Sequence, residues 1–79
     1  MSAAETQEVK NLLLDSDQQF RQLAEQHHQL DHRLHQLHEK HYLSEPEQLE
    51  QVTLKKRKLA LKDQMENMVR AYQRQRAAS

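Results

Sequence analysis

Six histidines lie between residues 27 and 41, and they are the side chains of this sequence best suited to chemistry. On a helix, His28, His32 and His35 stand at i, i+4 and i+7 on one face. Glu39 follows one turn later on the same face. Imidazole and carboxylate groups at this spacing can share a divalent metal ion. A polar face made of Gln and His explains the same residues, because one exposed helix face offers few groups to orient the ligands. The metal site therefore stands as an alternative.

The basic run Lys55-Lys56-Arg57-Lys58 is the second candidate. Four consecutive helical residues point in four directions, so the run forms a belt and not a stripe that would fit a nucleic-acid groove. One Phe and two Tyr leave no aromatic platform on which bases could stack. We expect the Lys stems to cover apolar surface. Weak nucleic-acid binding by the 55–58 belt is kept as another alternative.

The composition excludes several classes of function. The 79 residues include no Gly and no Cys, and Lys and Arg balance Asp and Glu at a formal net charge of zero. Without Gly, glycine-loop nucleotide sites are excluded, and without Cys, disulfides, Cys-based zinc sites and thiol nucleophiles are excluded. No arrangement of catalytic residues faces a concavity, so we expect no enzyme activity and no cofactor.

No stretch of this sequence resembles a targeting or membrane segment. The first residues lack the basic and apolar regions of a secretory signal, and the longest apolar run is Leu12–Leu14. We therefore expect a cytoplasmic protein with no membrane partner.

The histidines belong to a stretch with helical periodicity. Ser16 or Asp17 is a suitable N-cap, and apolar residues then recur every three or four positions. The pattern predicts a helix over about 17–41, preceded by a short helix or frayed arm over 1–15. Its apolar seam consists of Phe20, Leu23, His27, Leu30, Leu34 and Leu37, with His41 at the next position. A polar residue in such a seam, here His27, can fix the register of two helices.

A second helix is predicted to begin at Ser44-Glu45-Pro46-Glu47. Ser44 is a suitable cap, Pro46 fits the first turn, and Glu47 can bond back to the cap. The helix is expected over about 45–74, followed by a disordered tail at 77–79. Its side of the seam consists of Leu54, Leu61, Met65, Met68 and Tyr72.

Three further apolar residues of the second helix lie opposite its seam: Leu49, Val52 and Leu59. One partner helix cannot cover both sides. Exposed Leu and Val are common in small proteins, but a second copy or another helical protein would also explain this strip. The strip is our candidate surface for self-association or partner docking.

Two blocks of sequence resemble a known family. The first is Phe20-x2-Leu23-x3-His27-x2-Leu30-Asp31-x2-Leu34, and the second is Leu54-Lys55-Lys56-x-Lys58-Leu59-x-Leu61-Lys62-Asp63-x-Met65. Together, over roughly residues 17–69, they resemble the YdcH-like family of small bacterial proteins of unknown function. The resemblance implies a helical hairpin and no catalytic residue or cofactor to carry over.

These patterns predict an all-α protein. A short connection between two long helices favours antiparallel neighbours, so we expect a coiled-coil-like two-helix hairpin over 16–76. Residues 1–43 carry a net charge of −3 and residues 44–79 a net charge of +3, which favours this pairing. The expected function is a non-enzymatic interaction or structural module. Its expected partner is a second hairpin or another helical protein.

Overall fold

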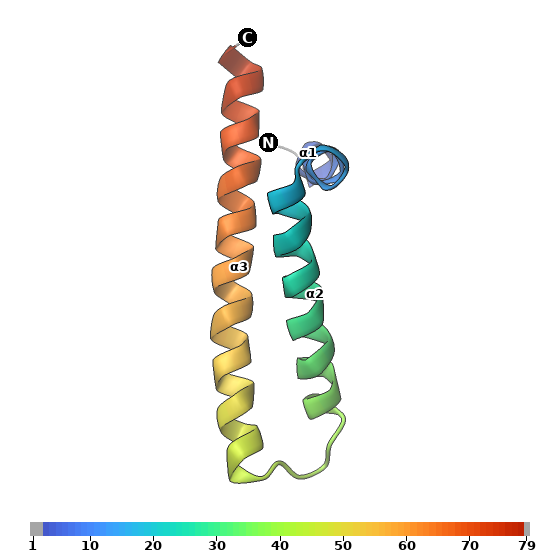
Figure 1. Ribbon diagram of the computed structural model, residues 1–79, viewed down its shortest axis with the longest axis vertical. Coiled ribbons are helices and arrows are strands. Elements are labelled where there is room, and N and C mark those ends of the chain that lie inside the picture. Colours follow the sequence, from blue (N-terminus) through green and yellow to red (C-terminus); the bar gives the residue numbers. More distant parts are fainter. Residues whose placement is uncertain (1–2, 79) are drawn as a thin grey trace.

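A computed structural model describes residues 3–78, and these residues form helices and no strand (Figure 1). The helices are α1 (Ala3–Ser16), α2 (Gln18–His38) and α3 (Glu45–Ala78). The predicted all-α class is therefore confirmed. None of these helices combines the length and hydrophobicity that crossing a membrane would need.

Helices α2 and α3 lie side by side and run in opposite directions, joined by residues 39–44 (Figure 1). They share the largest contact surface of the fold. In the same view α1 is seen nearly end-on beside the start of α2, so it runs across the other two helices. The resulting rod measures 53 × 20 × 19 Å.

The start of α2 is fixed by Asp17, one of the two expected caps. Its backbone is extended, with φ −119° and ψ 112°, and its Oδ1 accepts the Phe20 N–H at 2.9 Å. This bond satisfies one of the free amides of the first turn. The Ser16 hydroxyl instead donates to the Leu12 carbonyl at 2.7 Å, so Ser16 belongs to the end of α1.

Helix α2 ends at His38, and the prediction that it continues to His41 is wrong. Leu37 is only 1% exposed and is the last buried residue of the helix. The Lys40 N–H then closes the final turn on the Leu37 carbonyl at 3.2 Å. His41 and Tyr42 are exposed, so no apolar contact holds a further turn in place.

Helix α3 extends beyond its predicted end. It reaches Ala78, so the predicted disordered tail is wrong for Ala77 and Ala78, while Ser79 lies outside the described residues. The arm predicted over 1–15 is a helix from Ala3, and its first two residues also lie outside the described part. Val9 of α1 and Val69 of α3 are buried in one cluster, and this contact supports both segments.

Two buried clusters hold the rod together. The first lies where all three helices meet and consists of Val9, Leu13, Phe20 and Val69. The second lies near the bend and consists of Leu34, Leu37 and Leu54. Phe20 and Leu37 are the most deeply buried side chains, each 1% exposed. Burying a side chain of this size contributes about 1.5–3 kcal/mol.

The remaining seam residues are half-buried: Leu23, His27, Leu30, Leu61, Met65, Met68 and Tyr72. The buried Val69 was missing from the predicted seam. With Met65 and Tyr72 it forms an i, i+4, i+7 series, and α1 supplies the surface that covers it.

Candidate functional site

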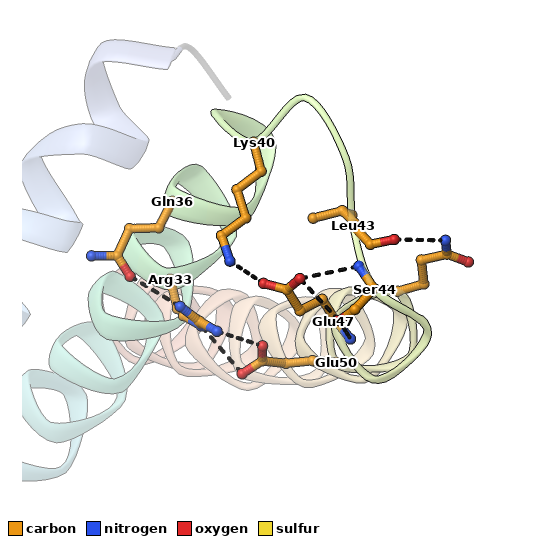
Figure 2. Close-up of polar contacts among 8 residues, drawn as sticks. Arg33, Gln36, Lys40, Leu43, Ser44, Glu47 and Glu50 are labelled. Atoms are coloured by element: carbon orange, nitrogen blue, oxygen red, sulfur yellow. Dashed lines mark hydrogen bonds and ion pairs between the residues drawn. The ribbon is translucent and has the colours of Figure 1, made fainter.

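The bend is organised by the first turn of α3 (Figure 2). The Ser44 N–H donates to Glu47 Oε1 at 3.0 Å, and the Glu47 N–H donates to Ser44 Oγ at 3.3 Å. These reciprocal bonds form the capping box expected from the sequence. The Gln48 side chain adds a bond to the Leu43 carbonyl at 3.1 Å, which ties the connection to the helix.

Near the bend, two ion pairs cross from α2 and its end to α3 (Figure 2). Arg33 binds both carboxylate oxygens of Glu50, at 2.8 and 3.2 Å. Lys40 pairs with Glu47, and together with the Ser44 bonds it lowers the pKa of Glu47 to about 2. The bond from Arg33 likewise lowers the pKa of Glu50. Because exposed pairs contribute little stability, their main effect is to fix how α3 lies against α2.

A groove of about 660 Å³ lies between α2 and α3 above this bend. It is open to solvent, because most of its lining residues are exposed. The α2 wall carries histidines and the α3 wall carries lysines; the lining is His28, Asp31, His32, Leu34, His35, His38, Lys55, Lys58, Leu59 and Lys62.

The lysines of the groove come from one face of α3. Lys55, Lys58 and Lys62 stand at i, i+3 and i+7, so they follow one another along the helix. Lys58 bonds Asp31 of α2 at 2.5 Å, and this bond lowers the pKa of Asp31. Among the described residues, Lys55 and Lys62 have no ion-pair partner within 4.0 Å.

The histidines of the groove do not favour the metal site that the sequence left as an alternative. Across the part of the chain that is described, no three His, Cys, Asp or Glu side chains are placed to hold one ion. His28 and His35 are two turns apart, about 10.5 Å along the axis. Glu39 follows the helix as its C-cap and bonds His35 Nε2 at 3.0 Å. His28, His32 and His35 share one wall of the groove, but these three and Glu39 are not gathered around one point where an ion could sit.

The basic run is also divided by the fold. Lys55 and Lys58 line the groove with Lys62, whereas Arg57 lines a different hollow beside Leu61. The basic residues of the 55–58 belt therefore do not all face one hollow. Sequence reasoning missed the lysine row because it treated 55–58 as a unit; the i, i+3, i+7 spacing was the signal that could have found it.

The strip Leu49, Val52 and Leu59 is exposed on α3. These side chains are 69%, 51% and 60% exposed, although Leu54 on the opposite side of the same helix is buried. At 100° per residue the three fall within an arc of about 80°. Leu59 also lines the groove, so the strip and the groove meet at this residue.

The comparisons with known proteins bear on the same part of the chain. Residues 20–69 match the family described as "Protein of unknown function (DUF465)", and YdcH-like proteins belong to this family. No curated protein and no solved structure matched. The matched residues contain the seam from Phe20 to Val69, the bend, the groove and the strip. Because the match covers more than half of the 79 residues, the chain belongs to this family of proteins of unknown function.

Proposed function

We propose that this protein is a non-enzymatic helical interaction module that pairs with a second copy of itself through the strip Leu49, Val52 and Leu59. The observation that carries the proposal is the exposure of all three side chains on one face of α3. Large apolar side chains grouped on one face favour a contact that removes them from water.

A non-enzymatic role is favoured by the shape of the rod. No charged or polar residue is buried among those whose side chains are described. The groove between α2 and α3 is lined mostly by exposed side chains. Enzymes usually work in enclosed sites where water is excluded and pKa values can be shifted.

The spacing of the strip suits an antiparallel pair of α3 helices. If Leu49 of one copy faces Leu59 of the other, the same contact occurs twice. The twofold axis then lies at the level of Leu54 along the helix, on the side opposite that buried residue. Val52 then lies between the two contacts. The whole chain has a formal net charge of zero, but residues 44–79 carry +3, so charge opposes this contact between two α3 helices and burial of the strip has to outweigh it.

The pair should be weak. Six partly exposed side chains contribute about 1–2 kcal/mol each, and association costs about 4–15 kcal/mol of lost freedom. We therefore expect dimers at micromolar or higher concentration.

Sedimentation equilibrium of the wild type and of Leu49→Glu tests the proposal. The wild type should approach twice its 9.5 kDa chain mass as concentration rises, whereas Leu49→Glu should remain a single chain. Leu12→Glu is the matched control, because it makes the same change at an exposed Leu of α1. A wild type that stays at the chain mass at millimolar concentration would reject self-pairing. Equal loss of association in both variants would reject the strip as the interface.

A further inference from the structure

The groove between α2 and α3 contains lysines that no acidic side chain among the described residues neutralises. It contains three lysines and a single acid, Asp31. Asp31 neutralises Lys58, and Lys55 and Lys62 have no acidic partner within residues 3–77. These two lysines are seven residues apart on α3, or about 10.5 Å along the helix axis.

The opposite wall adds hydrogen-bond donors. His28, His32 and His35 run along α2 at i, i+4 and i+7, which is the same length as the lysine row, although His35 Nε2 already bonds Glu39. A neutral imidazole offers one N–H and a lysine offers three. Lysine has no acceptor, so a ligand that satisfies both walls must be anionic and rich in acceptor oxygens.

The lining lacks two kinds of side chain that other anionic ligands would use. The groove contains no aromatic side chain on which a base could stack and no Arg that could grip a carboxylate with two bonds. Lysine binds phosphate as a point charge. A single phosphate can reach only one end of the row, whereas a chain of phosphates can reach both Lys55 and Lys62.

We propose that the groove between α2 and α3 binds a linear phosphate chain, held by Lys55 and Lys62 on one wall and by His28 and His32 on the other. Lys58 is partly withheld from the ligand by Asp31. This site meets the pairing strip at Leu59, and Lys56 lies within the arc of the strip, so the titrations below are made at a protein concentration low enough for single chains.

Calorimetric titration with tripolyphosphate tests the proposal on the full chain. Lys55→Gln should weaken binding about tenfold, because it removes a charged contact. Lys56→Gln is the matched control: the neighbouring lysine undergoes the same change but does not line the groove. It should bind like the wild type. Lys62→Gln should behave like Lys55→Gln.

Asp31→Asn provides a test in the opposite direction. It removes the only acid of the groove and releases Lys58, so binding should tighten about threefold. A merely destabilised protein would not bind more tightly. Circular dichroism of each variant checks that the helices are retained.

Several results would overturn the proposal. Equal weakening by Lys55→Gln and Lys56→Gln would mean diffuse attraction to the basic helix. Orthophosphate binding as tightly as tripolyphosphate would reject a chain that spans the row. Tighter binding of duplex DNA, with the same response to Lys55→Gln, would assign the groove to nucleic acid instead. Absence of tripolyphosphate binding by the wild type at low salt would reject the site.

Discussion

Replacement of Leu37 by alanine should lower the free energy of unfolding by about 2–3 kcal/mol. Leu37 is 1% exposed and packs with Leu34 and Leu54, and Leu30 and Leu43 border this cluster. Truncation of a buried Leu to Ala costs about 2–5 kcal/mol, depending on how far the surroundings can relax. The rod is only 20 × 19 Å across, so the space left behind lies near the surface and can partly close. We therefore expect a loss in the lower half of the range of about 2–5 kcal/mol.

This loss is large for so small a protein. At about 0.05–0.15 kcal/mol per residue, a domain of this size has a total stability of about 4–12 kcal/mol. Loss of about 2–3 kcal/mol should lower the Tm by roughly 10–20 °C.

The assay is urea unfolding followed by circular dichroism, at a protein concentration low enough for single chains. Leu49→Ala is the control, since it makes the same chemical change where the side chain is 69% exposed. Its effect should stay within about 0.5 kcal/mol. Equal destabilisation by Leu37→Ala and Leu49→Ala would refute the assignment of the core to one face of each helix.

The remaining predictions concern the helix ends and one buried amide. The pKa of Glu47 lies below its ordinary value of 4.5, at about 2, so the stability from its bonds is present above pH 4.5 and lost as pH falls towards 2. Glu47→Gln should therefore flatten the decline of Tm over this range, and an unchanged slope would contradict the role of the Lys40 and Ser44 bonds. Asp17→Ala should lower the free energy of unfolding by about 1 kcal/mol, while Ser16→Ala should change it by less than about 0.5 kcal/mol; equal losses in urea titrations would contradict the cap assignment. Within the described residues Gln73 Nε2 is shielded from solvent and has no hydrogen-bond partner, so Gln73→Met should raise the Tm, and a lower Tm would show that the amide is satisfied.

The helices that the sequence predicted best are those with a chemical start signal. Ser44 and Glu47 form the capping box that their spacing indicated, because the bonds involve residues three apart and depend little on the rest of the fold. The end of α2 carried no such signal. His41 continued the apolar spacing, but no surface of α3 covers it, so the last turn is lost.

The crossing of α1 over the other two helices could not be predicted from the pattern of α1 alone. Val9 and Leu13 are buried because α1 crosses the other helices near Val69, and such a crossing depends on contacts between distant residues. The same contact explains why Val69 was missing from the predicted seam.

Of the two candidate surfaces, the strip could be predicted from the sequence and the groove could not. Exposure of Leu49, Val52 and Leu59 agrees with their place opposite Leu54 on the helix, which follows from periodicity alone. The groove could not be predicted in the same way, because it depends on which α2 residues face Lys55 and Lys62. That depends on how the two helices are aligned. The ion pairs Arg33–Glu50 and Lys58–Asp31 mark that alignment, but neither pair could be assigned from spacing within one helix.

The distance between two spin labels at position 74 tests the proposed pairing most directly. The chain has no Cys, so Arg74→Cys introduces a single labelling site, and Arg74 is exposed on α3. An antiparallel pair centred near Leu54 places the two labels 40 residues apart along the joint axis, or about 60 Å. We predict a distance distribution centred near that value, which disappears when Leu49→Glu is added. A short distance, as in a parallel pair, or no dipolar coupling at concentrations where dimers should form would contradict the account.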